Sequence, residues 1–106
     1  MIPNTIWKFP LEIVDEQIIE MPAGSKILCV DTQGRDQIAK GGGIEGAAAF
    51  MWAVVDPKAK KNPLKVFVHG TGHEVKDLHR KEYIGTFQQH GGALVWHVFI
   101  GFGPNG

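Results

Sequence analysis

Residues 83–100, YIGTFQQHGGALVWHVFI, constrain the fold of this chain more than any other stretch. Residues 83–88 and 93–100 are each typical of a strand, and the second is especially rich in β-branched and aromatic side chains. The His-Gly-Gly between them, at 90–92, favours a tight hairpin turn because adjacent glycines adopt the positive φ that such turns need. The second strand is apolar on both faces, so we expect it in the middle of a sheet.

Residues 5–13 and 25–32 are also predicted to be strands. Residues 5–13 alternate between apolar and polar side chains, which is the period of a half-buried strand, and Pro10 favours a position at the edge of a sheet. Residues 25–32 are apolar on both faces, so we expect a central strand in which Cys29 is a small buried hydrophobic residue.

Residues 47–55 and 64–69 favour strands, whereas residues 15–21 are ambiguous between helix and strand, with Pro22 favouring a strand. The count is about six strands, joined by short turns, with little helix. We therefore predict a mainly β, single-domain antiparallel sandwich or barrel. Turns or loops are predicted at 22–24, at 57–63, at 70–73 and at 74–82, the last with one helical turn as an alternative.

Length and composition fit one domain that spans residues 1–106. Lys plus Arg and Asp plus Glu both number 11, so the zero net charge argues against generic nucleic-acid binding. Residues 34–46 hold five glycines and are predicted to form a flexible loop, and residues 101–106 a loose tail. A phosphate-cradling loop is the alternative at 34–46, although neither GxxxxGK[ST] nor GxGxxG is present there. We see neither a signal peptide nor an apolar run that could span a bilayer, so we expect a cytoplasmic protein with no membrane contact.

Side chains that carry chemistry form no familiar catalytic pattern. Ser25 is the only serine and lies outside any GxSxG motif, and Thr71 and Thr86 have no motif around them. His69 and His73 suggest metal ligands when joined by a distant acid, but the HExxH spacing is absent. We therefore predict no catalytic residue, no metal and no cofactor. The other ionisable candidates are His79, His90, His97, Asp31, Asp56 and Glu74.

The turn at 70–73, Gly-Thr-Gly-His, is the best candidate for contact with a ligand. Its glycines expose backbone N–H groups that can form an anion-binding nest, its threonine adds a hydroxyl, and its histidine can become cationic. The alternative is a purely structural turn, with a pocket at a subunit interface instead. The ligand-binding candidates are therefore Gly70, Thr71, Gly72 and His73, together with Trp52, Gln88 and His97 for the interface pocket.

Seven segments together resemble a family of small proteins encoded by bacteriophages and prophages and known as a domain of unknown function. The resemblance covers nearly the whole chain and departs at 34–46, where the family has a shorter connection. It brings no established activity, and it implies a phage origin and expression in the cytoplasm of the bacterial host. The segments are 6–11, Gln17 with 21–24, 27–28 with Val30, 52–57, 70–73, 83–88 and 91–99.

These observations favour a non-enzymatic, homo-oligomeric protein that binds a small anionic ligand, because exposed sheet edges tend to pair and the turn at 70–73 suits an anion. By analogy with phage proteins that sequester signals, the ligand is expected to be a nucleotide-type immune signal, bound to counter host defence. The alternatives are a protein that binds another protein, an accessory protein of the virion or its assembly, and a small hydrolase.

Overall fold

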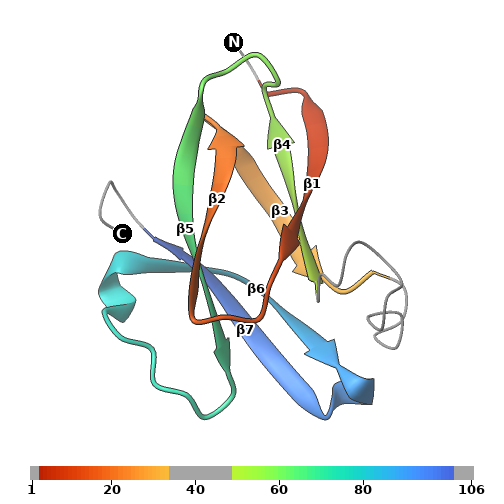
Figure 1. Cartoon of the computed structure of the whole chain (residues 1–106), viewed down its shortest axis with the longest axis vertical. Coiled ribbons are helices and arrows are strands. Elements are labelled where there is room, and N and C mark those ends of the chain that lie inside the picture. Colours follow the sequence, from red (N-terminus) through yellow and green to blue (C-terminus); the bar gives the residue numbers. More distant parts are fainter. Residues whose placement is uncertain (1–2, 34–48, 102–106) are drawn as a thin grey trace.

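Two antiparallel sheets stacked face to face make up the part of the chain that the computed structural model describes, residues 3–33 and 49–101 (Figure 1). The three-stranded sheet has the order β1 (Thr5–Leu11), β4 (Ala49–Val55) and β3 (Lys26–Asp31). The four-stranded sheet has the order β2 (Glu16–Pro22), β5 (Lys61–Gly70), β7 (Leu94–Gly101) and β6 (Lys81–Gln89). Two short 3-10 turns, η2 (Leu78–Arg80) and η3 (His90–Gly92), precede and follow β6.

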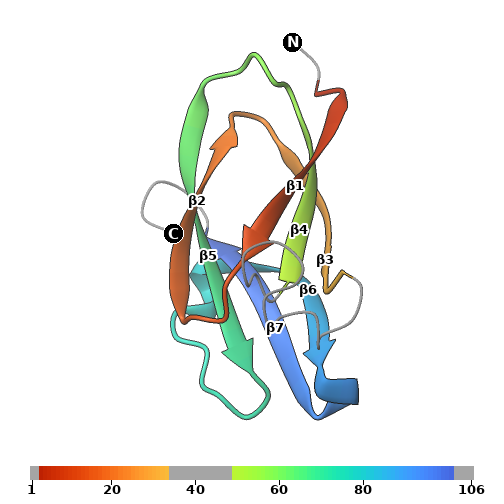
Figure 2. The same cartoon turned by 45° about the vertical axis from the view of Figure 1, so that its right-hand side comes forward.

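The predicted class is confirmed, and the architecture is an open sandwich rather than a closed barrel. Figure 2 shows β2 and β5 on one side of the molecule and β1 and β4 on the other. Seven strands are described instead of about six, because the ambiguous residues 15–21 contribute the strand β2. In the described ranges, no helix is long and apolar enough to cross a membrane.

The core lies between the two sheets and follows from the alternation of side chains along the strands. On β4, Met51, Ala53 and Val55 are fully buried, and on the facing sheet Val66 and Val98 are equally inaccessible. Full burial of a valine or methionine side chain contributes about 1.5–3 kcal/mol to the stability of the folded state. The opposite faces of β5 and β7 point away from the core and are free to carry a functional site.

The hairpin predicted over residues 83–100 is confirmed, as β6 and β7. β7 lies between β5 and β6, in the middle of its sheet, and β1 with Pro10 lies at an edge. The turn has positive φ values at His90 (54°), Gly91 (68°) and Gly92 (97°).

The prediction that residues 25–32 form a central strand is wrong, because β3 lies at the end of its sheet and, among the described strands, is hydrogen-bonded to β4 alone. The prediction that Cys29 is buried is also wrong. A register shift between Ile27 and Cys29 interrupts the alternation, so that Leu28 and Cys29 are both exposed while Val30 is buried. A bulge of this kind places two consecutive side chains outside the core.

The predicted loop at 57–63 is too long, because β5 begins at Lys61 and pairs with β2 from there. Pro63 is tolerated because β7 pairs with β5 only from Val66, which leaves β5 as an edge strand at the proline. Similarly, the strand predicted over 5–13 ends at Leu11, and β6 begins at Lys81. The loop predicted at 34–46 and most of the tail, 102–106, lie outside the described residues, and Gly101 ends β7.

Candidate functional site

The outer face of the four-stranded sheet carries an aromatic and histidine-rich strip across β5, β7 and β6. The register pairs His69 with His97 and Phe67 with Phe99, so these four side chains share one face. The ring of His69 lies 5.9 Å from that of Phe99, and the ring of Tyr83 lies 5.7 Å from Phe99 on the other side, both nearly edge to face. Alternation along β5 therefore places residues of the core and of this strip on opposite faces of the same strand.

A chain of four hydrogen-bonded side chains crosses this face. The Thr71 hydroxyl lies 2.8 Å from His97 Nε2, and His97 Nδ1 lies 3.1 Å from the Thr86 hydroxyl. The Tyr83 hydroxyl continues the chain at 2.6 Å from Thr86. Both ring nitrogens of His97 are engaged, and one of them donates while the other accepts in either neutral tautomer. The imidazole is thus held in one orientation by hydroxyl groups from two directions.

The turn at 70–73 uses most of its own backbone donors. Gly70 N–H donates to His73 Nδ1 at 3.2 Å, and His73 N–H donates to the Gly70 carbonyl at 3.0 Å. Thr71 N–H donates to the Val95 carbonyl at 3.2 Å. In residues 3–33 and 49–101, Gly72 N–H has no hydrogen-bond partner. The nest predicted for this turn is therefore reduced to one available donor, and His73 Nδ1 accepts a hydrogen bond from within the turn.

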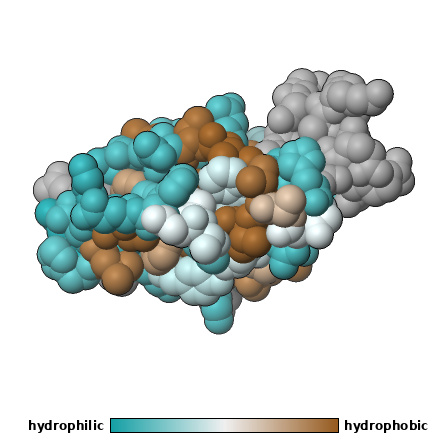
Figure 3. All heavy atoms as spheres, turned by 90° about the horizontal axis from the view of Figure 1, so that it is seen from below, coloured by the Kyte–Doolittle hydropathy of each residue, from teal (hydrophilic) through white to brown (hydrophobic). Residues whose placement is uncertain are grey.

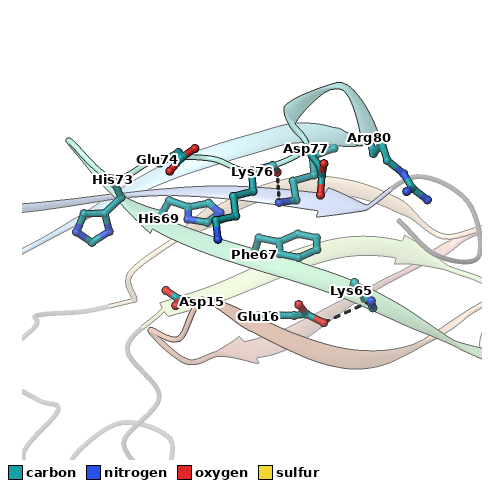
Figure 4. Close-up of a pocket in the computed structure, with 11 residues that line it drawn as sticks. Asp15, Glu16, Lys65, Phe67, His69, His73, Glu74, Lys76, Asp77 and Arg80 are labelled. Atoms are coloured by element: carbon teal, nitrogen blue, oxygen red, sulfur yellow. Dashed lines mark hydrogen bonds and ion pairs between the residues drawn. The ribbon is translucent and has the colours of Figure 1, made fainter.

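A cavity of about 490 Å³ adjoins the strip, between the start of β2 and the connection from β5 to β6 (Figure 4). Phe67 lies in its middle, with Asp15 and Glu16 on one side and the 74–77 segment on the other. Lys81 Nζ lies 4.2 Å from the centroid of the Phe67 ring and also donates to the Lys76 carbonyl. The lining residues are Asp15, Glu16, Lys65, Phe67, His69, His73, Glu74, Lys76, Asp77, Arg80 and Lys81.

The charges of the cavity are mixed in sign. Four side chains are Lys or Arg and four are Asp or Glu, and among the described residues one ion pair is formed, Lys65 Nζ to Glu16 at 3.5 Å. Lys76 and Arg80 come from the connection, where both are exposed. The cavity therefore offers cations and carboxylates to a ligand at the same time.

His69 is the most perturbed group of the site. Its Nε2 is buried and has no hydrogen-bond partner within the described part of the chain. Burial lowers the pKa of the imidazole below its usual 6.5, and the charge of Lys81 and the nearby His73 act in the same direction, against an opposing effect of Asp15. The neutral form of His69 is therefore the one that the folded state favours.

This shift predicts that stability falls as the pH falls. A histidine with a lowered pKa in the folded state binds more protons in the unfolded chain. The contribution of neutral His69 to the free energy of unfolding is therefore complete above about pH 6.5, the pKa in the unfolded chain. It is lost as the pH falls through that value and then through the lower pKa of the folded state. Urea unfolding between pH 7.5 and 5 should show a larger loss for the wild type than for His69→Gln. His79→Gln, in the exposed η2, is the control. Identical pH profiles for wild type and His69→Gln would refute the assignment.

The structure brings some predicted site residues together and separates others. Thr71 and His97, predicted independently, are in direct contact, and His73 lines the cavity. Gln88 is exposed on β6, outside the cavity. Trp52 lies on the outer face of the other sheet, where its ring lies 6.1 Å from Phe50.

Sequence reasoning missed Phe67, Tyr83 and Lys81 as site residues. Pairing residues 64–69 with 93–100 would have placed Phe67 beside Phe99, because paired residues share a face.

Among the ionisable candidates, the Asp31 and Asp56 carboxylates accept hydrogen bonds from the backbone N–H groups of Thr32 and Lys58. In the described ranges, no group of three or more His, Cys, Asp or Glu residues is arranged to hold a metal ion.

Viewed from the end of the molecule that lies at the bottom of Figure 1, the surface shows separate hydrophobic patches among hydrophilic side chains (Figure 3). Fold and site together define a small all-β protein with a mixed-charge cavity on the outside of its larger sheet. The chain belongs to the family described as Domain of unknown function (DUF7352), whose model matches residues 2–104. No curated protein and no solved structure matches the chain. The phage origin that the resemblance implied stays a prediction.

Proposed function

We propose that this protein binds a small anionic, nucleotide-type ligand in the cavity around Phe67 and does not transform it there. The proposal rests on the mixture of four cationic and four carboxylate side chains around Phe67 in a cavity of about 490 Å³. Within the described part of the chain, Glu16 is the only one of these carboxylates in an ion pair, and Lys76 and Arg80 are exposed. Ligand sites commonly have volumes of roughly 300–1,000 Å³ and a few polar groups that fix the orientation of the ligand.

A nucleotide fits this mixture better than a simple anion does. Its phosphates would contact Lys76 and Arg80, since cationic side chains form the stronger, charge-assisted hydrogen bonds with phosphate oxygens. Its ribose hydroxyls and base amino groups would donate to carboxylates such as Asp15 and Glu74, which only accept when ionised. His69 Nε2, which has no hydrogen-bond partner among the described residues, offers a further polar contact if the connection at 71–80 moves. A simple anion would leave the carboxylates facing its own negative charge.

We also propose a biological setting for this binding. A phage-encoded protein in the cytoplasm of the bacterial host would sequester a nucleotide immune signal and so counter host defence. This part rests on the family resemblance and on the analogy with other signal-sequestering phage proteins.

We also propose that the chain forms a homo-oligomer. Each sheet has two edge strands, and the outward sides of β1 and β3 carry Ile6 and Leu28 with 61% and 47% of their surface exposed. Exposed edges and apolar side chains favour association with a second copy. Light scattering at micromolar concentration should give a multiple of the mass of one chain, and the mass of a single chain would refute self-association.

Charge reversal at the cavity tests the binding proposal. Lys76→Glu should weaken the binding of a phosphate-bearing ligand about tenfold, equivalent to roughly 1.4 kcal/mol, because a favourable charge is replaced by a repulsive one. Calorimetric titration would use ADP-ribose and a panel of cyclic dinucleotides. Lys26→Glu, an exposed charge on the other sheet, is the matched control and should leave affinity unchanged. Equal weakening by both variants would indicate a general charge effect and no site at the cavity.

A further inference from the structure

We propose that Thr71 is a nucleophile that His97 activates, and that it accepts an acyl group from small carboxylic esters. This activity goes beyond ligand binding in the cavity and does not depend on it. The geometry that points to it is the distance of 2.8 Å between the Thr71 hydroxyl and His97 Nε2. A nucleophile within hydrogen-bond reach of a base that a third group orients is the recurring arrangement of covalent catalysis.

The third group is the Thr86 hydroxyl, 3.1 Å from His97 Nδ1, which the Tyr83 hydroxyl holds in turn at 2.6 Å. When His97 carries its hydrogen on Nδ1, it donates to Thr86 and leaves the Nε2 lone pair directed at the Thr71 hydroxyl. Thr86 therefore acts as a positioning residue that holds the imidazole ring in place and can accept from Nδ1–H in the productive tautomer. Thr71 directly follows β5, and its N–H donates to the Val95 carbonyl of β7. His97 of β7 and Thr86 of β6 are paired residues, so the register of the sheet fixes their relative positions.

Stabilisation of the reacting carbonyl oxygen would come from the backbone of the turn. Gly72 N–H directly follows the nucleophile and has no partner within the described residues. The amide that follows a nucleophile is a common oxyanion donor. A Cβ at Gly72 would meet no atom within 4 Å, so the space beside this amide is open to a substrate. Thr71 is itself exposed, which suits a small acyl group that approaches from solvent.

The reaction balances without a further reagent other than water. The Thr71 oxygen attacks the carbonyl carbon of the ester while its proton passes to His97 Nε2. The bond between that carbon and the leaving oxygen then breaks, and His97 returns the proton to the departing alkoxide, which leaves an acyl ester on Thr71. Water attacks this ester in the second step, again with His97 as base, and releases the carboxylic acid with Thr71 restored.

The experiment uses p-nitrophenyl acetate with the full chain, and follows nitrophenolate release together with peptide mass spectrometry. We expect one acetyl group on the peptide that contains Thr71, with Thr71→Ser retaining the adduct and Thr71→Val losing it. His97→Gln should slow acylation about a hundredfold, the typical contribution of a general base. Thr32→Ala, directly after β3 of the other sheet, should behave as wild type.

Thr86 needs a readout that a purely structural role would not move. Thr86→Val should slow acylation, and Thr86→Ser, which keeps the hydroxyl, should restore it, while circular dichroism shows that all variants are folded. The proposal is overturned if the wild type carries no acetyl group on Thr71, or if Thr71→Val, folded, releases nitrophenolate as fast as the wild type. Acetylation confined to lysines would also overturn it.

Discussion

Replacing Phe87 by alanine is expected to lower the free energy of unfolding by about 3–5 kcal/mol. Phe87 is 2% exposed and is among the largest fully enclosed side chains of the described core. It points inward from β6 opposite Trp96 of β7, so its removal leaves a cavity at the heart of the sandwich. Because single domains are stable by only about 5–15 kcal/mol, this loss is a large share of the total.

Urea denaturation followed by tryptophan fluorescence measures this loss. Leu94→Ala, on the neighbouring strand with 41% of the leucine exposed, is the matched control and should cost less than about 1 kcal/mol. A loss below about 1 kcal/mol for Phe87→Ala would contradict the position of the core between the sheets.

A methyl group added at Gly85 is expected to cost about 1–3 kcal/mol, because the two sheets approach each other closely there. A Cβ at Gly85 would lie 2.5 Å from Cγ2 of Val30, on β3 of the opposite sheet. The methyl group of a valine has little freedom to move aside, so the strands themselves must shift. At a strand position without such a contact, replacing glycine by alanine leaves the stability unchanged or raises it. A loss of stability at Gly85 would therefore indicate the close contact.

A double-mutant cycle tests this close approach. Val30→Ala removes the atom that a Cβ at residue 85 would meet, so Gly85→Ala should cost clearly less in that background than in the wild type. Urea titrations of the wild type, the two single variants and the double variant give four free energies of unfolding, and from these the coupling energy between residues 30 and 85. Strictly additive effects would mean that the two residues do not touch across the sandwich.

Local patterns in the sequence predicted the parts of the fold that local patterns determine. The hairpin of β6 and β7, its glycine turn and the edge position of Pro10 follow from propensity and alternation over a few residues. The neighbours of β3 are set by the division of the strands between two sheets, which is a long-range property. The exposure of Cys29 depends on a one-residue bulge beside Ile27, which periodicity alone does not reveal.

In the candidate site, too, local sequence patterns indicate single residues, whereas long-range contacts determine which of them meet. The chemistry of the side chains indicates the turn at 70–73 and His97 separately, and their contact arises from the register that pairs His69 with His97. The cavity around Phe67 was not predicted, because it forms where the polar connection from β5 to β6 passes beside the sheet, and such a segment has no periodicity that fixes its path. Trp52 lies on the other sheet for the same long-range reason.

Chemical-shift mapping tests the central claim, a ligand site at the cavity on the outer face of the four-stranded sheet, most directly. The ¹⁵N-labelled protein would be titrated with ADP-ribose and the cyclic dinucleotides, and the amide signals followed residue by residue. We expect that at least one of these ligands shifts signals mainly within residues 65–81, with the largest changes near Lys76 and His69. Unchanged spectra with every ligand, or changes confined to β1, β3 and β4, would contradict it.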